Sequence, residues 1–405
     1  MLAAAVLVGS ALTVCAALAD RPAVGAAPNG SLVLRPADGQ HVLVNGVDFR
    51  SLLERLDAQS SQLAVLNNRL QTHLAALRCN ATADTTSITV APGADLWLAG
   101  VLAGNGKIYG IPFNAASVLI IDPSAQTADT TSINIALVAS AKWVGGVLAG
   151  NGKIYGIPRS VSSVLIIDPA TNTVDTTTIV LPGALGWHLG VLAGNGKIYG
   201  VPAVGSSVLI IDPATDTADT TSITENSNES GNGKWVGGAL APNGKIYCVP
   251  FDASSVLIID PSTNTTDTTT MTGFDGGNKW WSGVLAGNGK IYGIPRDATA
   301  VLIIDPATNS SDTTTLGGLD GAWAGGVLGD SGKIYGIPKF AGAVLVIDVA
   351  TNTTDTTSIP VPAPGNDLQW RSGVLADNGK IYGLPASAGS VLVIETVSCT
   401  VPGGL

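Results

Sequence analysis

Charged side chains are scarce in this chain, and so are histidine and cysteine. Of the 405 residues only 12% are charged, three are histidines and four are cysteines. We find no histidine and cysteine cluster with metal-ligand spacing, no serine–histidine–aspartate arrangement and no phosphate-binding loop. The net charge of −10 argues against nucleic acid or an anionic membrane as partner. We therefore predict no catalytic residue, no metal and no cofactor, and we lean towards a protein that is not an enzyme.

Glycine and a short repeated motif are abundant instead. The chain has 50 glycines and 22 prolines, and 45% of it is hydrophobic, a composition typical of a turn-rich all-β protein. The segment Asn151-Gly-Lys-Ile-Tyr-Gly-Ile-Pro158 recurs nearly unchanged around seven lysines: Lys107, Lys153, Lys197, Lys245, Lys290, Lys333 and Lys380. Because these lysines are 43 to 48 residues apart, the pattern predicts a seven-bladed β-propeller of four-stranded blades, with one repeat per blade.

One repeat contains four candidate strands separated by turn residues. In the second repeat they are Trp143 to Ala149, Lys153 to Pro158, Ser163 to Asp168 and Asp175 to Ile179. The third is a continuous apolar run, which indicates a strand covered on both faces. The glycine-rich first strand suits the crowded innermost position, and the threonine-rich fourth suits an exposed outer edge.

These units resemble the YVTN-type β-propeller repeat. The matching residues are the pair Ile154-Tyr155, the strand Ser163-Val-Leu-Ile-Ile-Asp168 and the turn Pro169-Ala-Thr-Asn-Thr173. The resemblance implies the propeller fold over roughly 310 residues. It does not select a function, because that family includes surface proteins, binding modules and enzyme subunits. The Trp-x-x-Gly opening of each repeat departs from the family pattern.

The two ends of the repeat region are complementary. Asn80 to Ile88 reads as a fourth strand without a blade, whereas the last repeat stops at Glu395 without its fourth strand. We therefore expect the N-terminal strand to complete the seventh blade, giving a propeller over 79–400 and a tail at 401–405. Cys79 and Cys399 would then both fall in the turn between third and fourth strands. We predict a disulfide there, stabilising by about 4–5 kcal/mol in the chain-entropy model.

The residues before the propeller divide into three segments. Residues 1–19 are apolar and end in Ala17-Leu-Ala19, which indicates a secretory signal peptide, with an uncleaved anchor as the alternative. No other stretch is long and apolar enough to insert in a membrane. Residues 20–47 are a linker with a short hairpin, in which Ser31 to Arg35 pairs with His41 to Val44. A secreted or cell-surface protein also fits glycosylation sequons in equivalent exposed turns, at Asn264, Asn309 and Asn352.

Residues 48–78 have the pattern of a helical coiled-coil stalk. Asp48 is a candidate N-cap. Apolar residues recur every seven positions at Phe49, Leu56, Leu63, Leu70 and Leu77, with Leu52 and Leu66 at intermediate d positions. Two arrangements are open: self-association into a homo-oligomer, which we favour, and a single helix docked on the propeller.

All eight tryptophans lie in the repeat region, and seven of them open the first strands. They are Trp97, Trp143, Trp187, Trp235, Trp280, Trp323 and Trp370, with Trp281 as an extra residue. They should line one rim, together with variable residues that follow the second strands, among them Arg159, Phe251, Arg296 and Lys339. Two interpretations are open for the tryptophans: packing between blades, and a stacking platform for sugar rings.

The repeated acidic residues and lysines also have two interpretations each. Aspartates flank every turn between third and fourth strands, and they either bond turn amides or, less often, hold calcium. The seven lysines are solubilising groups or a ring that attracts an anion. Glu225 and Glu229 lie in one longer inter-blade loop, break the repeat symmetry and are the only acidic candidates for a catalytic role that stand out.

We therefore predict a non-catalytic binding protein that uses the loop rim of the propeller, with a carbohydrate or a protein as ligand. Two alternatives remain. One is a lactonase-like propeller enzyme, suggested only by analogy with the family. The other is a structural surface component with no discrete ligand.

Overall fold

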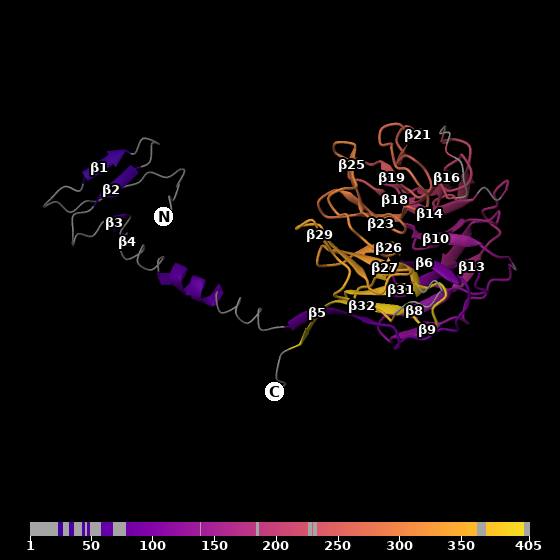
Figure 1. Cartoon of the computed structure of the whole chain (residues 1–405), viewed down its shortest axis with the longest axis horizontal. Coiled ribbons are helices and arrows are strands. Elements are labelled where there is room, and N and C mark those ends of the chain that lie inside the picture. The colour runs from indigo at the N-terminus through magenta and orange to yellow at the C-terminus, as the bar shows by residue number, and fades with distance from the viewer. Residues whose placement is uncertain are drawn as a thin grey trace. The chain divides into compact units, whose positions relative to one another are not determined.

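The structure is a computed structural model that describes residues 23–26, 32–35, 43–44, 47–48, 58–67, 78–137, 139–183, 186–225, 229, 233–362 and 370–400. It divides into two compact units (Figure 1). One comprises Met1–Arg78 with Cys399–Leu405, and the other is Cys79–Ser398.

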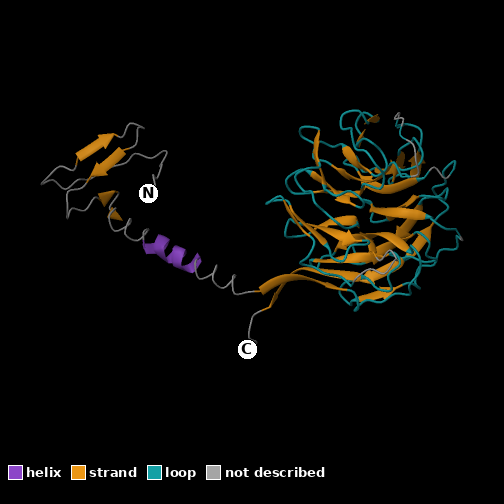
Figure 2. Ribbon diagram, in the orientation of Figure 1, coloured by secondary structure: helices purple, strands orange, loops and turns teal. Residues whose placement is uncertain are grey.

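The larger unit is a seven-bladed β-propeller, as the repeat predicts. It contains seven four-stranded antiparallel sheets, and six of them use four consecutive strands (Figure 2). The first strands of consecutive blades are neighbours all round the ring, and the contact of β30 with β6 closes it. The blades are numbered 1 to 7 from β6 onwards.

The first strand of each blade begins at tryptophan and lies against the central channel. Its fourth residue is glycine, and a Cβ added at Gly146 would lie 2.6 Å from Ile111 Cδ1 of the preceding blade, so only glycine fits there. A bulge between Trp143 and Gly146 offsets the pairing with the second strand. These strands are β6 (Trp97–Leu102), β10 (Trp143–Leu148), β14 (Trp187–Leu192), β18 (Trp235–Leu240), β22 (Trp280–Leu285), β26 (Trp323–Leu328) and β30 (Trp370–Leu375).

The second and third strands form the buried middle of each blade. Ile154, Leu165 and Ile167 of blade 2 pack in one cluster with Tyr109 and Ile111 of blade 1, so the core is a set of layers between blades. The second strands are β7 (Ile108–Pro112), β11 (Ile154–Pro158), β15 (Ile198–Pro202), β19 (Ile246–Pro250), β23 (Ile291–Pro295), β27 (Ile334–Pro338) and β31 (Lys380–Pro385). The third strands are β8 (Leu119–Asp122), β12 (Leu165–Asp168), β16 (Leu209–Asp212), β20 (Leu257–Asp260), β24 (Leu302–Asp305), β28 (Leu345–Asp348) and β32 (Leu392–Thr400).

The fourth strands lie earlier than the sequence suggests. In blade 2 the prediction of a strand from Asp175 to Ile179 is wrong, because the strand ends at Asp175 and residues 176–179 are bends. The Asp175 carboxylate accepts the backbone N–H groups of Thr177 at 2.6 Å and Thr178 at 3.1 Å, and this turns the chain. The fourth strands are β9 (Thr127–Asp129), β13 (Thr173–Asp175), β17 (Thr217–Asp219), β21 (Thr265–Asp267), β25 (Ser310–Asp312), β29 (Thr353–Asp355) and β5 (Arg78–Asp84).

The N-terminal strand β5 completes blade 7, as predicted from the two ends. It is the neighbour of β32 in the sheet β30-β31-β32-β5. After it, the Val391 N–H donates to the Ile88 carbonyl at 2.9 Å, the same bond that Val118 makes to Ile133 in blade 1. Cys79 lies on β5 and Cys399 on β32, but the side chains of both lie outside the described residues, so the disulfide stays a prediction.

Among the described residues of the N-terminal unit are two small antiparallel ladders and one helix. Strand β2 (Leu32–Arg35) pairs with β1 (Ala23–Ala26) and not with the segment ending at Val44, which corrects the predicted hairpin. Strand β3 (Leu43–Val44) pairs instead with β4 (Val47–Asp48), and the Asn-Gly sequence between them favours such a turn.

The helix spans residues 58–67, inside the predicted range 48–78. Asp48 ends β4, and because residues 49–57 lie outside the described residues, its role as N-cap stays a prediction. Arg78 already begins β5. Leu63 and Leu66, both seam positions of the predicted heptads, are 67% and 60% exposed. The remaining heptad positions and the segment 1–19 lie outside the described residues.

Candidate functional site

The seven tryptophans that open the first strands are buried between blades. Each indole N–H donates to the backbone carbonyl of the residue twenty positions later, as Trp143 does to Ser163 at 2.7 Å and Trp280 to Ala300 at 2.8 Å. The Trp143 ring packs with Tyr109 and Ile111 of the preceding blade. This is the packing interpretation, and these rings have no exposed face on which a sugar could stack. The seven are Trp97, Trp143, Trp187, Trp235, Trp280, Trp323 and Trp370.

The eighth tryptophan, Trp281, has a different environment. It is the second residue of β22, a position that faces the central channel, and it is 7% exposed. Trp281 contacts the side chains of His188 from blade 3 and Phe251 from blade 4, both edge-on, with ring centroids 5.2 and 5.4 Å away. The aromatic cluster therefore joins three consecutive blades around one end of the channel.

Three cations also surround the Trp281 ring. The distances from the ring centroid are 4.9 Å to the Arg371 guanidinium carbon, 5.5 Å to the Lys339 ammonium and 5.9 Å to the Arg296 guanidinium carbon. They come from blades 7, 6 and 5, so the cluster spans five blades. We call this group the channel mouth: His188, Phe251, Trp281, Arg296, Lys339 and Arg371.

The rest of this end of the channel is apolar. Leu98, Val144 and Ala386 form a buried cluster, with Phe113 and Leu189 packed against it. These residues come from blades 1, 2, 3 and 7, so the apolar wall continues from the channel mouth. A pocket of about 210 Å³ lies at this end of the channel, and first-strand glycines line it together with Leu98, Val144, His188, Leu189 and Trp281.

The cations of the channel mouth are incompletely neutralised. Arg371 forms an ion pair with Asp95 at 3.1 Å, and Arg296 donates to Asn278 and lies 3.9 Å from Asp297, whose side chain is 51% exposed. Within the described residues, the Lys339 ammonium has no hydrogen bond and no ion pair, although Lys339 is only 2% exposed.

Burial changes the protonation of these groups. Desolvation, together with repulsion from Arg371 and Arg296, lowers the pKa of Lys339 to about 7. Complete burial lowers the pKa of His188 well below its usual value, helped by the positive charges of Arg159 and Arg371, so this imidazole is neutral. Desolvation also lowers the pKa values of Arg371 and Arg159 from their usual value.

The structure brings together part of the predicted rim. Phe251, Arg296, Lys339 and Trp281 meet at the channel mouth, and Arg159 lies close enough to His188 to influence its pKa. Sequence reasoning missed His188 and Arg371. Both are second residues of first strands, where the other blades carry leucine, valine or alanine besides Trp281, so an unusual residue at that position was the available signal.

The repeated polar residues are structural groups of the periphery. Lysines of the second-strand turn pair with the last aspartate of the third strand, as Lys107 does with Asp122 at 3.4 Å. Tyrosine hydroxyls connect neighbouring blades, as Tyr155 does by donating to Asp216 of the next blade at 2.6 Å. No group of three or more histidine, cysteine, aspartate or glutamate residues that could hold a metal occurs in the described part of the chain.

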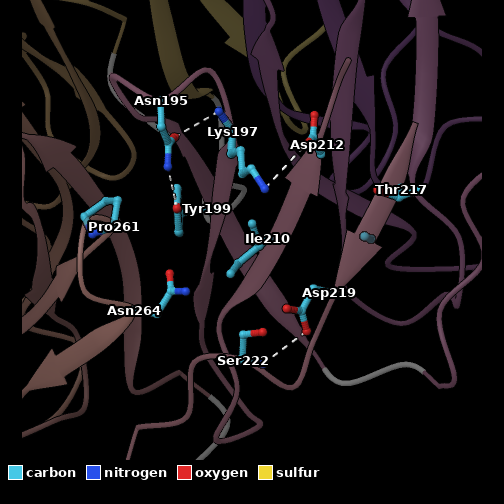
Figure 3. Close-up of a pocket in the computed structure, with 11 residues that line it drawn as sticks. Asn195, Lys197, Tyr199, Ile210, Asp212, Thr217, Asp219, Ser222, Pro261 and Asn264 are labelled. Atoms are coloured by element: carbon cyan, nitrogen blue, oxygen red, sulfur yellow. Dashed lines mark hydrogen bonds and ion pairs between the residues drawn. The ribbon is translucent and has the colours of Figure 1, made fainter. Parts of the chain in front are cut away.

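One peripheral seam is more open than its neighbours. A groove of about 330 Å³ lies between blades 3 and 4, where Tyr199 and Asn195 bond each other at 2.9 Å but not the turn that carries Pro261 and Asn264 (Figure 3). Its walls are formed by an ion pair of Lys197 with Asp212 and by other residues at repeated positions, which have the same or similar residues in most blades. Nothing in its chemistry is special to this position.

The remaining asymmetric residues also have structural partners. Glu225 forms a buried ion pair with Lys234, and the Glu229 carboxylate accepts from the N–H and hydroxyl of Ser254 at 2.7 and 2.6 Å. Cys248 is buried, and burial raises the pKa of its thiol. Asn264, Asn309 and Asn352 lie in exposed turns with positive φ, and the Asn309 side chain accepts a hydrogen bond from the Tyr247 hydroxyl at 2.8 Å. No helix among the described residues is long and apolar enough to cross a membrane.

No family model and no curated protein matches the sequence. Solved structures with the same fold include a streptogramin B lyase, at 12% identity and a TM-score of 0.63, covering 79% of this chain and 98% of that one. Another is the extracellular domain of a hybrid two-component system from B. thetaiotaomicron, at 11% identity and a TM-score of 0.55, covering 75% and 40%. A third is an auxiliary nutrient binding protein from Bacteroides ovatus, at 14% identity and a TM-score of 0.51, covering 79% and 78%. At these identities the likeness is one of fold.

Proposed function

We propose that this protein is a non-catalytic binding protein whose ligand, a carbohydrate or a protein, is taken at the channel mouth. The observation that carries the proposal is the environment of Trp281. Side chains from five blades converge on this ring, and the repeat accounts for none of them. Deviation from the repeat at one place on a regular scaffold is how repeat proteins form binding surfaces.

The energetics of the channel mouth support a role in binding. A buried ammonium that has neither a hydrogen bond nor an ion pair costs stability, and a neutral residue of similar size would avoid this cost. Violations of local rules of this kind concentrate at functional sites. Lys339 is therefore better explained by a ligand that it contacts than by the stability of the free protein.

A glycan array with the mature, glycosylated protein tests the carbohydrate arm. A hit should shift or quench tryptophan fluorescence, and the change should be lost in Trp281→Phe while Val180→Ala, on the exposed periphery, binds as the parent does. A hit that is unaffected by Trp281→Phe would place the ligand elsewhere and overturn the proposed site. No hit on the array would move the proposal to a protein ligand.

We also propose that the protein is secreted or displayed at the cell surface. The apolar segment 1–19 supports this, as do the proposed bridge between Cys79 and Cys399 and sequons in exposed turns at Asn264, Asn309 and Asn352. Two of the similar structures are extracellular domains. Non-reducing peptide mapping should find Cys79 linked to Cys399, and a free thiol at either residue would contradict the bridge.

The stalk is proposed to associate with further copies of the chain. The exposed side chains of Leu63 and Leu66 lie at heptad seam positions, and such side chains are normally covered by a partner helix. Light scattering should report an oligomer for the mature chain and a monomer for Leu63→Ser/Leu66→Ser. The matched control Ser60→Ala/Gln62→Ala keeps the oligomer, and a monomeric parent would contradict the proposal.

A further inference from the structure

We propose that the channel mouth recognises a carboxylate group of its ligand, held between Arg296, Lys339 and Arg371, with the organic part of the ligand along the neighbouring apolar wall. This inference rests on the proposed function and specifies the chemistry of the same site. It is carried by the arrangement of charges and apolar surface around Trp281.

The first argument is the charge balance. The protein has 30 acidic and 20 basic residues, yet three basic side chains lie within 6 Å of the centre of one ring. Asp95 neutralises Arg371 in part, and Asp297 lies 3.9 Å from Arg296 on the solvent side. No carboxylate pairs with Lys339 within the described residues. One anionic group supplied by a ligand would complete this set.

The second argument is the type of donor. Two guanidinium groups and one ammonium present donors from three consecutive blades, and guanidinium groups match the two oxygens of a carboxylate geometrically. The Arg371 and Arg296 Nε atoms are both buried and make no hydrogen bond in the described structure, so neither guanidinium group has all of its donors satisfied. The ring of Trp281 behind them keeps the cations fixed.

The third argument is the wall beside the cations. Leu98, Val144 and Leu189 line the pocket of about 210 Å³ at this end of the channel, together with Trp281. An inorganic anion would leave this wall unused, whereas an organic acid would place its body against it. The ligand class is therefore an organic carboxylate.

Protonation of Lys339 provides a linked readout. Its ammonium faces Arg296 and Asp297 from blade 5, Arg371 from blade 7 and Asp95 before blade 1. A bound carboxylate raises the pKa of Lys339, so binding takes up a proton when the free protein has its pKa near 7. The carboxylate of the ligand stays ionised above pH 5, so its own charge does not change between pH 6 and pH 9. The affinity should nevertheless fall over this range, because Lys339 loses its proton and with it the positive charge that attracts the carboxylate.

The test is calorimetry on the full mature chain with two acids, phenylacetate and glucuronate, and with their neutral amides. We expect at least one acid to bind about 10-fold or more tightly than its amide. Lys339→Met should lose this preference, and Lys339→Arg should keep binding but abolish its decline between pH 6 and pH 9. Lys290→Gln, a peripheral lysine in an ion pair with Asp305, is the control and should bind as the parent does.

The contrary outcomes are distinct. If an amide binds as tightly as its acid and Trp281→Phe abolishes both, the site is correct and carboxylate recognition is wrong. Acid binding that survives Lys339→Met with its pH dependence intact also overturns the inference. If neither acid binds while an array glycan does so through Trp281, the proposed function stands and this inference falls. Inorganic sulfate that binds as tightly as both acids would show that the apolar wall contributes nothing, which also contradicts it.

Discussion

Trp280 and Trp281 are adjacent in sequence but belong to two different systems. Trp280 occupies the position at which every blade has tryptophan, is 4% exposed and donates to the Ala300 carbonyl. Trp281 has no counterpart in the other blades and contacts aromatic and cationic side chains instead of a backbone acceptor. Burial alone does not distinguish the two residues, since both rings are almost completely covered. What distinguishes them is the set of groups that each side chain contacts.

The difference separates the seams between blades from the channel mouth. In the seams the same bond and the same apolar contact recur from blade to blade, so each contributes to closing the ring. At the channel mouth each blade contributes a different group, and the buried cation of Lys339 is expected to cost stability. Repetition therefore marks the scaffold of this protein, and departure from repetition marks the proposed site.

The largest expected effect comes from removing one ring of each kind. Trp280→Ala leaves a cavity between blades 4 and 5 and an unpaired Ala300 carbonyl, so it should lower the free energy of unfolding by about 3–5 kcal/mol. Trp281→Ala should cost less, because water can enter from the channel, and blade 6 already has Ala324 at this position. Chemical denaturation measures both. An equal loss in the two variants would remove the distinction between seam and site.

The next effect has the opposite sign. Lys339→Met should raise the free energy of unfolding at pH 7 by about 1–4 kcal/mol, since it replaces a buried cation with an apolar residue. The pKa of Lys339 is about 7 in the folded protein and near 10.4 in the unfolded chain. Between these values the unfolded chain binds more protons, so the stability of the parent rises with pH.

The advantage of Lys339→Met should therefore shrink as the pH is raised from 7 to 10. Denaturation at several pH values checks this, with Lys290→Gln as the peripheral control. A Lys339→Met variant that is less stable than the parent at pH 7 would show that this lysine contributes to the scaffold.

Two tyrosines sharpen the comparison within the seams. Tyr155 donates to Asp216 of the next blade, whereas the described structure gives Tyr199 only its bond from Asn195 of the same blade (Figure 3). Tyr155→Phe should cost about 1–2 kcal/mol because a hydrogen bond to a charged group is lost, and Tyr199→Phe about 0.5 kcal/mol or less. Equal costs would mean that the open groove between blades 3 and 4 is not a weaker seam.

The sequence predicts the seams far better than the site. Three sequence features are sufficient to predict the closed seven-bladed ring: the repeat period, the apolar third strands, and the complementary ends at Asn80 and Glu395. The prediction is robust because the same strand pattern occurs in seven repeats, so a wrong assignment in one repeat is corrected by the others. The fourth strand was misplaced, since the bonds from Asp175 to Thr177 and Thr178 turn the threonine-rich segment away. Threonine favours strands, and here local side-chain bonds overrode that preference.

The channel mouth was predicted only in part, for a geometric reason. Arg296 and Lys339 stand out as variable loop residues, but His188 and Arg371 lie inside strands with ordinary neighbours. Their convergence on Trp281 depends on how five blades meet at the axis, which no local pattern specifies. Comparing each residue with its equivalent in the other blades would have identified both.

A further small effect concerns the turn aspartates, and its pH dependence has a different cause from that of Lys339. Hydrogen bonds, first from the Thr178 side chain and then from the Thr177 backbone, lower the pKa of Asp175 to about 2. Its folded pKa lies below the unfolded value near 3.9, so its stabilising contribution is complete above about pH 4 and is lost as the pH falls towards 2. Because Asp175 lies near the surface, solvent screens this contribution, and Asp175→Asn should cost less than about 1 kcal/mol at neutral pH.

Several equivalent aspartates share this behaviour. The dependence of the free energy of unfolding on pH below about 4 is therefore expected to come mainly from aspartates at the periphery of the ring. The lowered pKa values occur at Asp84, Asp129, Asp219, Asp312 and Asp355. Denaturation of the parent from pH 5 to pH 2 should show a progressive loss that Lys339→Met leaves unchanged in slope, since Lys339 is fully protonated there in both states. Asp175→Asn should reduce that slope slightly and leave the rise between pH 7 and pH 10 intact. Lys339→Met could instead change the loss of stability between pH 5 and pH 2, or Asp175→Asn the rise between pH 7 and pH 10. Either result would show that the seams and the channel mouth are energetically coupled and have to be treated as one system.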